Sequence, residues 1–313
     1  MDVGRTLLFV PGDRPDRIAK ALTSGADAVA VDFEDAVGEA SKETARALTA
    51  EALTRLAPAP PGGAAPGASG AAVRPAVLVR INALETPEAE ADLAAVASLL
   101  GTVRLDGLIV PKAESVRQLD ELDARLTAAE AAAGTGPGEL SLLPVVETAA
   151  GVLASAGVAA AGPRVHAVLF GTLDLAAGLG VRPSVEGREL LHARSQLVLA
   201  ARAAGLTGIL DGPYAALDDE NGLARSTLAA RELGFTGRAV LHPRQLAPVR
   251  AAFTPTDAEL DQARAVLAAH RDASGRGAAA VRLSDGTFVD RPVVARAEAL
   301  LRESGRHGAE AGS

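Results

Sequence analysis

Two short apolar runs that each lead into an acidic residue form the most informative pattern in this sequence. Residues 142–146 lead into Glu147, and residues 168–173 lead into Asp174. Both runs are shorter than a typical helix and contain Pro or Gly, so we predict two strands that are buried on both faces. Neither run contains His or Cys. Two carboxylates at the ends of successive strands suit a hard divalent cation, and Mg²⁺ held by few protein oxygens and several waters fits this donor set. Taken singly, such an acid is often a helix N-cap or a loop charge, so the prediction depends on the pair.

Charged and polar residues also follow the other predicted strands. In a parallel barrel the carboxyl ends of all strands lie at one end of the barrel, here called the mouth, so these residues would lie close together there. They are Glu34, Asp35, Arg80, Asn82, Lys112, Asp211 and His242. An Arg that faces a metal site can hold a substrate carboxylate through two N–H groups, while the metal binds the adjacent substrate oxygen. This combination indicates enolate chemistry on a 2-oxo or 2-hydroxy acid.

Each of these residues also has an ordinary structural role open to it. A charged side chain at a strand end can form an ion pair with a neighbour, and a single His at a helix start is commonly structural. The specific alternatives are an ion pair of Arg80 with Glu34 or Asp35, an ion pair of Lys112 with Glu147, and a helix cap formed by His242.

The elements that would position these residues alternate between strand and helix. Short apolar runs are followed by stretches in which apolar residues recur at helical spacing. The pattern predicts eight strand–helix pairs, with strands at 7–10, 27–33, 76–81, 107–110, 142–146, 166–170, 208–210 and 238–241 and helices at 16–22, 41–56, 87–100, 115–133, 149–160, 188–204, 222–233 and 244–252. Eight pairs in about 250 residues are typical of a (β/α)₈ TIM barrel, an α/β fold whose active site lies at the carboxyl ends of the strands.

A doubly wound open sheet is the alternative α/β fold. It would normally have a glycine-rich turn after its first strand, and residues 9–13 (FVPGD) lack this turn. The near match to a dinucleotide-binding motif at 275–280 follows a predicted helix and not a strand. We therefore predict a TIM barrel over residues 1–253, interrupted at 58–75 by a flexible stretch rich in Pro, Gly and Ala.

Composition excludes several other classes of protein. The chain has 313 residues, of which 48% are hydrophobic, contains no Cys and no Trp, and carries a formal net charge of −8. Disulfides, thiolate metal sites and thiol nucleophiles are therefore excluded. No basic run is interleaved with aromatic residues, which argues against nucleic acid as a partner. The N-terminus shows no signal-peptide pattern and long apolar stretches are interrupted by charges, so we expect a cytoplasmic protein without a membrane partner.

Seven short motifs follow one another along nearly the whole chain. They are RTLLFVPG (5–12), DFEDAV (32–37) with Lys42 and Arg46, VRIN (79–82), IVPK (109–112), VET (146–148), FGTLDL (170–175) and LHPRQ (241–245). As an ordered set they resemble the citrate lyase beta-subunit-like family. This family belongs to the HpcH/HpaI aldolase superfamily of Mg²⁺-dependent carbon–carbon lyases, which also includes malyl-CoA and citramalyl-CoA lyases. The chain departs from the family in having Phe33 where Leu is usual and in the length of the stretch at 58–75.

The resemblance implies a site and a reaction. By position, Glu147 and Asp174 match the Mg²⁺ ligands, and Arg80 matches the residue that binds the oxo-acid carboxylate. The implied reaction is cleavage or formation of a 3-hydroxyacyl thioester of the malyl-, citramalyl- or citryl-CoA type. Its other partners would be an acyl-CoA thioester and a 2-oxo acid, namely oxaloacetate, glyoxylate or pyruvate. The further substrate-binding residues that we predict from the strand ends are Glu34, Asp35 and Lys112.

Two related activities and one unrelated role stay open. The chain could act as a citrate lyase beta subunit on citryl-acyl-carrier protein within a complex, or the same site could hydrolyse a malyl-CoA thioester. A binding module that has lost turnover would show a broken set of site residues, whereas here the set is complete, with Arg80, Glu147, Asp174 and Asp290 all present.

The chain continues beyond the predicted barrel as a C-terminal extension at 254–304. The sequence predicts a helix at 257–271, two short strands at 279–283 and 287–289, and a last helix at 292–302, with disorder at 305–313.

Asp290 is the residue of this extension that could do chemistry. In CoA-dependent relatives the similar segment covers the active site of a neighbouring subunit, where its acid is a catalytic acid/base, and Asp290 stands at the matching position. The resemblance thus implies a homotrimer or a dimer of trimers. Alternatively, Asp290 could simply cap the final helix.

Overall fold

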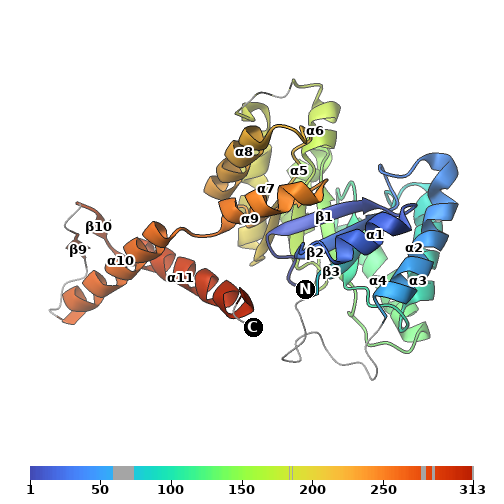
Figure 1. Ribbon diagram of the computed structural model, residues 1–313, viewed down its shortest axis with the longest axis horizontal. Coiled ribbons are helices and arrows are strands. Elements are labelled where there is room, and N and C mark those ends of the chain that lie inside the picture. The colour runs from blue at the N-terminus through green and yellow to red at the C-terminus, as the bar shows by residue number, and fades with distance from the viewer. Residues whose placement is uncertain (59–73, 183, 185, 276–279, 284–285, 312–313) are drawn as a thin grey trace. The chain divides into compact units, whose positions relative to one another are not determined.

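Eight parallel strands close into a barrel in the order of the sequence, and β8 pairs with β1. Strands β1, β2 and β3 and the helices that follow them are labelled in Figure 1. The computed structural model describes residues 1–58, 74–182, 184, 186–275, 280–283 and 286–311. The strands are β1 Thr6–Pro11, β2 Ala28–Asp32, β3 Ala76–Arg80, β4 Gly107–Val110, β5 Ser141–Val146, β6 Ala167–Phe170, β7 Gly208–Asp211 and β8 Gly237–Val240. The predicted (β/α)₈ barrel is confirmed. Most of the stretch predicted to be flexible, from 59 to 73, lies outside the described residues.

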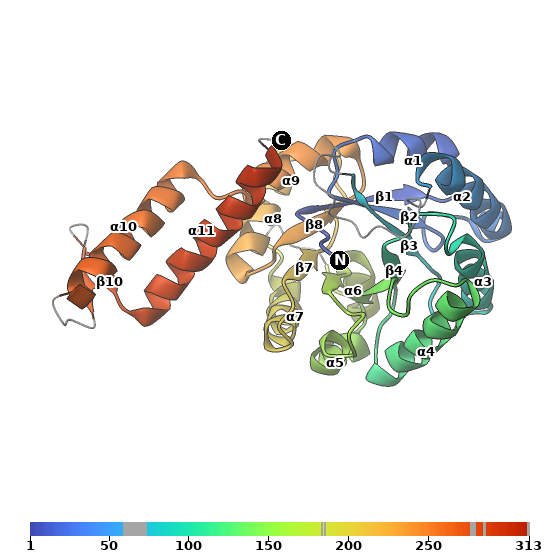
Figure 2. The same ribbon diagram turned by 90° about the horizontal axis from the view of Figure 1, so that it is seen from below.

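Helices surround the strands (Figure 2). They are α1 Pro15–Leu22, α2 Lys42–Leu56, α3 Pro87–Leu99, α4 Val116–Ala132, α5 Ala149–Ala159, α6 Thr172–Leu179, α7 Leu191–Ala203, α8 Glu220–Leu233 and α9 Leu246–Phe253, with 3₁₀ turns η1 Glu39–Ser41, η2 Arg188–Leu190 and η3 Pro243–Gln245. Side-chain caps start several of them: Ser115 accepts from Gln118 N at 3.3 Å, and Thr148 accepts from Gly151 N at 3.0 Å. Within the part of the chain that is described, no helix is long and apolar enough to cross a membrane.

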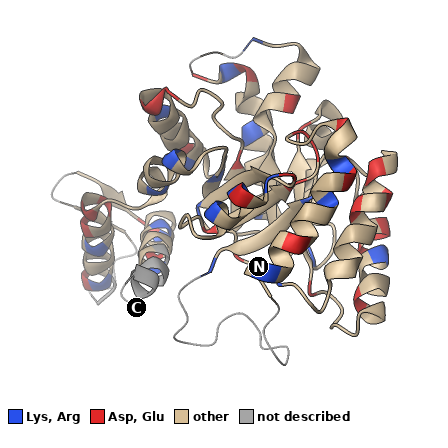
Figure 3. Cartoon of the chain, turned by 45° about the vertical axis from the view of Figure 1, so that its right-hand side comes forward, with Lys and Arg blue, Asp and Glu red and all other residues tan. Residues whose placement is uncertain are grey.

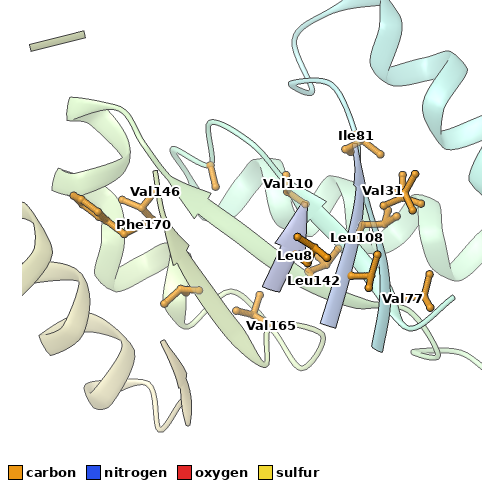
Figure 4. Close-up of a cluster of buried hydrophobic side chains, with 14 of the residues drawn as sticks. Leu8, Val31, Val77, Ile81, Leu108, Val110, Leu142, Val146, Val165 and Phe170 are labelled. Carbon is orange, nitrogen blue, oxygen red and sulfur yellow. The ribbon is translucent and has the colours of Figure 1, made fainter. Parts of the chain in front are cut away.

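Side chains along each strand alternate between two hydrophobic layers. The layer inside the barrel includes Leu7, Ala30, Leu78, Ile109, Leu143, Val145, Leu169 and Leu210. The layer between strands and helices, drawn in Figure 4, includes Leu8, Val31, Val77, Leu108, Val110, Leu142, Val146 and Phe170. The charged residues accordingly lie mainly on helices and loops, as Figure 3 shows.

The same alternation decides which strand-end residues face the barrel mouth. Asp32, Arg80 and Glu147 continue the inward-facing positions of β2, β3 and β5. Asp211 instead continues the outward-facing positions of β7, because its neighbour at a spacing of two, Ile209, belongs to the outer layer. Inward-facing charges at the carboxyl ends of strands therefore collect in one place, where TIM barrels carry their active sites.

Helix α6 differs from what the sequence predicted. We expected a strand run that continued to Asp174, but β6 ends at Phe170, and Thr172–Leu179 form a helix. A short apolar run does not by itself distinguish a strand from a helix, and here Gly171 separates the two elements. Asp174 thus lies in the first turn of α6, where the positive end of the helix dipole favours a carboxylate.

The C-terminal extension is a separate compact unit that begins at Thr254. Helices α10 (Asp257–Gly275) and α11 (Arg291–Ala311) flank two short antiparallel strands, β9 (Val281–Arg282) and β10 (Phe288–Val289). A small core holds the unit together and includes Ala263, Val266, Val289, Val294 and Ala297. Helix α11 extends to Ala311, and the disorder expected at 305–313 stays a prediction.

A buried ion cluster ties β7 and β8 to α7 on the outer side of the barrel. Asp211 is 2% exposed and accepts from Arg194 Nε at 3.2 Å and from Arg194 Nη2 at 2.7 Å. It also accepts from Arg238, which is equally buried and further contacts Ser226. Two guanidinium groups therefore share one carboxylate in the absence of solvent.

We expect Asp211→Asn to lower the free energy of unfolding by about 3 to 5 kcal/mol, because removing one partner leaves buried cations uncompensated. Chemical denaturation followed by circular dichroism measures this loss. Asp218→Asn is the matched control, since Asp218 is 95% exposed and pairs with Arg244 at the surface; its unfolding curve should coincide with that of the wild type. A loss below about 1 kcal/mol in Asp211→Asn would contradict a stabilising role of the cluster.

Candidate active site

Arg80, at the end of β3, is the central cation of the barrel mouth. The register of β2 and β3 places Asp32 opposite Arg80, and Asp32 accepts from Arg80 Nε at 2.7 Å and from Nη2 at 2.6 Å. The guanidinium also lies over the ring of Phe9, 5.1 Å from its centre. Burial alone would lower the pKa of Arg80, but the charges of Asp32, Glu34 and Asp35 outweigh this effect and raise the pKa. Arg80 is therefore a permanent positive charge.

A tight turn after β2 brings two more carboxylates to the same guanidinium. Asp32 accepts from the backbone N–H groups of Glu34 and Ala36 at 2.9 and 3.0 Å, which fixes the turn. Arg80 Nη1 lies 3.1 Å from Asp35 Oδ2 and 3.1 Å from Glu34 Oε2, although hydrogen-bond geometry is met only with Asp35. Glu34 is buried and Asp35 is exposed, so Glu34 is the more strongly desolvated acid of the two.

A buried polar network supports this turn from behind. Lys42 Nζ donates to the carbonyl oxygens of Phe33 and Glu34 at 3.0 and 3.2 Å and to Asn82 Oδ1 at 2.5 Å. Asn82 in turn donates to Phe33 O at 3.0 Å and, through Nδ2, to Asp92 at 2.7 Å. Asn82 is thus a structural residue beneath the turn and does not face the mouth as an open ligand.

Lys112, which follows β4, connects the turn with the next acid. Its Nζ donates to Glu34 Oε1 at 2.9 Å, and its backbone N–H donates to Glu147 Oε1 at 2.9 Å. Burial lowers the pKa of Lys112, but the bond to Glu34 and the charges of Glu34, Glu147 and Asp35 together outweigh this effect and raise the pKa. Lys112 has a φ of +49°, the one positive φ among the described non-glycine residues. The left-handed conformation costs such a residue about 1 to 2 kcal/mol, and it allows both bonds to form at once.

Glu147 is the most perturbed acid of the mouth. Burial, together with the charges of Glu34 and Asp174, raises the pKa of Glu147 to about 8, although the Lys112 N–H and Arg80 oppose the shift. Glu147 is 4% exposed, while Asp174 is half-buried. The charge of Asp174 contributes to the raised pKa of Glu147, so the two carboxylates are near enough to interact. Their pairing as metal ligands stays a prediction.

The donor set of Glu147 and Asp174 fits Mg²⁺. Both are carboxylates, the ligands that a hard cation prefers, and they lie where negative charge is in excess. Within the described part of the chain, no group of three or more His, Cys, Asp or Glu side chains could hold a metal. Two protein ligands suit Mg²⁺, which keeps several of its waters.

Gly171 makes room for Glu147 between β5 and β6. A Cβ added at Gly171 would overlap the Cβ of Glu147 and would lie 2.5 Å from its Oε2. A glycine is therefore required at this position by the carboxylate itself, and the requirement links the Gly171 backbone to the proposed metal ligand.

Besides Asn82, two other residues that we expected in the mouth have structural roles. Asp211 points outward into the buried cluster with Arg194 and Arg238. Side chains alternate along a strand, and position 211 on β7 faces away from the barrel interior. His242 is exposed and caps η3, where its Nδ1 accepts from Arg244 N at 3.1 Å. For His242 the structural alternative is thus the one observed.

Asp32 and Lys42 are the residues of the site that sequence reasoning missed. An ion pair of Arg80 with Glu34 or Asp35 was the structural alternative, and both ion pairs form at 3.1 Å. The closest contacts of Arg80 are nevertheless with the two oxygens of Asp32. The signal was present in the spacing, since Ala30 and Asp32 share one face of β2. Lys42 gave no such signal, because a lysine in a helix normally faces solvent.

Comparisons with known proteins agree with this geometry. The chain belongs to the HpcH/HpaI aldolase/citrate lyase family, whose model matches residues 5–243. It is 33% identical to the citrate lyase subunit beta of Leuconostoc mesenteroides subsp. cremoris, over 95% of this chain and 92% of that protein. It is 32% identical to the L-malyl-CoA/beta-methylmalyl-CoA lyase of Rhodobacter capsulatus, over 96% and 95%. The structure of the protein CitE from Mycobacterium tuberculosis in complex with magnesium, acetoacetate and coenzyme A matches with a TM-score of 0.75 and 34% identity, over 97% of this chain and 98% of that one.

The family resemblance inferred from the motifs is therefore confirmed, and the chain is a lyase of this family. Magnesium as the cofactor agrees with the solved relative, whose complex contains it. The roles of individual residues, including Glu147, Asp174 and Arg80, stay predictions.

We expect Gly171→Ala to weaken magnesium binding roughly tenfold to a hundredfold, because overpacking of about 1 to 3 kcal/mol must displace Glu147. Calorimetric titration with MgCl₂ measures the effect. Gly178→Ala is the control in the same helix, since a Cβ there meets no atom within 4 Å. Equal magnesium affinities of the two variants would show that Glu147 is not a ligand.

Proposed function

We propose that this chain is a Mg²⁺-dependent lyase that cleaves a 3-hydroxyacyl-CoA thioester of the malyl, citramalyl or citryl type into an acyl-CoA thioester and a 2-oxo acid, and that also catalyses the reverse condensation. The observation that carries the proposal is the buried carboxylate of Glu147, which lies within electrostatic reach of Asp174 and of the permanent cation Arg80. Support comes from relatives named as citrate lyase and malyl-CoA lyase subunits and from the complex of one relative with magnesium, acetoacetate and coenzyme A.

Each residue of the mouth has a separate task in this proposal. Glu147 and Asp174 would hold Mg²⁺, which when bound withdraws negative charge from the oxygen of the oxo acid. Arg80 binds the oxo-acid carboxylate through the N–H groups that Asp32 leaves available. Lys112 opposes protonation of Glu34 through its direct bond and orients Glu147 through its backbone N–H. The mouth thereby fixes the oxo acid at two points and orients its carbonyl.

The reaction requires two proton transfers. In the cleavage direction a base removes the proton of the substrate hydroxyl, the carbon–carbon bond breaks, and its electron pair passes to the thioester as an enolate. Asp290 then protonates the enolate carbon, and in the condensation direction its carboxylate removes that proton again.

Asp290 lies in the C-terminal unit, immediately before α11. Its Oδ1 accepts from Val293 N at a long 3.3 Å, so the helix cap considered as its structural role is present but weak. A cap uses one carboxylate oxygen and leaves the other for a substrate proton. We propose that Asp290 reaches the mouth of a neighbouring subunit in a homotrimer or a dimer of trimers, as the sequence resemblance implies.

One assay distinguishes this proposal from two alternatives. Purified protein with Mg²⁺ and acetyl-CoA is incubated with glyoxylate, pyruvate or oxaloacetate, and condensation products and free CoA are quantified. Condensed thioester from free CoA substrates supports the stand-alone lyase. Activity only with an acyl-carrier-protein thioester would favour a subunit of a citrate lyase complex, and release of free CoA would favour a thioesterase. A cytoplasmic location stays a prediction of the sequence.

We expect Glu147→Gln to raise the magnesium concentration for half-maximal activity by roughly 100-fold or more, since loss of a mere supporting group at a metal site costs 10- to 100-fold. An amide oxygen is a poorer ligand than a carboxylate for a hard cation. Activity measured against magnesium concentration tests this, with Glu121→Gln on the exposed face of α4 as the control. Near-normal activity of Glu147→Gln at limiting magnesium would remove Glu147 from the metal.

Shared sites between subunits give a further prediction. At limiting magnesium, Asp290→Asn and Glu147→Gln should each be inactive alone, but mixing them under conditions of subunit exchange should restore part of the activity. The mixture creates sites in which an intact Glu147 meets an intact Asp290 from a neighbour.

The control is a mixture of Glu147→Gln with Asp174→Asn, because both changes damage the same barrel mouth and cannot complement each other. Exchange is monitored with two subunit tags. If exchange occurs and the first mixture stays as inactive as the second, Asp290 acts within its own chain or has no catalytic role.

A further inference from the structure

Asp32 bonds to four donors with its two carboxylate oxygens. Oδ1 accepts from Arg80 Nε and from Glu34 N, and Oδ2 accepts from Arg80 Nη2 and from Ala36 N, at distances between 2.6 and 3.0 Å. Asp32 itself is 1% exposed, so no solvent competes for these bonds. One carboxylate thus joins the Arg80 side chain to the turn that carries Glu34.

The pairing decides which edge of Arg80 meets a ligand. A guanidinium has two edges that can form a bidentate pair with a carboxylate. Asp32 takes the edge formed by Nε and Nη2, and Phe9 covers one face. Nη1 is left toward the mouth, where its hydrogen-bond partner is Asp35, whose side chain is 55% exposed. The end edge of Arg80 is therefore presented beside a side chain that solvent already reaches.

We propose that Asp32 is a positioning residue for oxo-acid binding, which holds the Nη1/Nη2 edge of Arg80 toward the substrate carboxylate and fixes the turn at 34–36 in the same step. This inference rests on the proposed function, because it assigns the clamp to Arg80. An arginine without such a partner has several rotamers, and their loss on binding would weaken the clamp.

The chain contains a matched structural pair for comparison. Asp211 accepts from Nε and Nη2 of Arg194 in the same bidentate manner and is equally buried, but it faces outward on β7. A change at Asp211 therefore removes a buried carboxylate from an arginine without touching the mouth. The two aspartates separate a loss of positioning from a general loss of stability.

The test measures the KM for the oxo acid and the KM for acetyl-CoA separately, using whichever of glyoxylate, pyruvate or oxaloacetate the wild type condenses. In Asp32→Asn the amide N–H would oppose an Arg80 N–H, so we expect the KM for the oxo acid to rise roughly tenfold or more while the KM for acetyl-CoA changes less than about twofold. Calorimetric binding of pyruvate in the presence of Mg²⁺ should show the same loss. Asp211→Asn should leave both KM values unchanged.

A double-mutant cycle shows whether Asp32 acts through Arg80. In the Arg80→Met background, Asp32→Asn should raise the KM for the oxo acid by less than about twofold, because no guanidinium remains to be positioned. A full tenfold rise in the KM for the oxo acid in that background overturns the inference about Asp32. It does not contradict the proposed binding of the oxo-acid carboxylate by Arg80. If Arg80→Met itself leaves the KM unchanged, the proposed clamp is wrong and the inference fails with it.

Asp32→Glu keeps the test decisive if Asp32→Asn does not fold. It retains the charge that compensates Arg80 but carries the carboxylate one methylene further from β2, so the guanidinium must move. The KM for the oxo acid should again rise while the KM for acetyl-CoA does not. Equal changes in both values would indicate a general distortion of the mouth and would overturn the positioning role.

Discussion

The charge pair of Asp32 and Arg80 is the interaction on which the arrangement of the barrel mouth depends. A guanidinium that is 12% exposed needs a compensating anion, since an unpaired buried ion costs several kcal/mol. The parallel register supplies this anion from the adjacent strand. Because Asp32 also accepts from the turn at 34–36, fixing Arg80 fixes Glu34, and through Glu34 the side chain of Lys112.

An excess of negative charge is the second constraint. Arg80 and Lys112 do not neutralise the mouth, and burial together with the neighbouring carboxylates raises the pKa of both Glu34 and Glu147. A cation that binds at Glu147 would therefore compete with its protonation. The electrostatic cost of gathering these acids is the physical reason why a cation, once bound, would order the site.

The fold and much of the site could be predicted from the sequence, because the carboxyl ends of all parallel strands in a barrel lie at the same mouth. Arg80, Glu147 and Lys112 follow from that rule. The direction in which a strand-end side chain points is harder to predict. Only the alternation of side chains along a strand distinguishes Asp32, which points inward, from Asp211, which points outward. The place of Asp174 on a helix was missed because its short apolar surroundings fit either element. Lys42 could not be found, as its burial depends on contacts from a distant strand.

The left-handed backbone of Lys112 limits how this site can vary. A replacement at position 112 would have to satisfy two unrelated requirements, a cationic side chain that reaches Glu34 and a main chain that accepts a positive φ. Glycine and asparagine meet the second requirement but not the first, and arginine meets the first at the same backbone strain. Position 112 is therefore expected to be among the least substitutable in the mouth, so a mutational scan would report its backbone and its charge together.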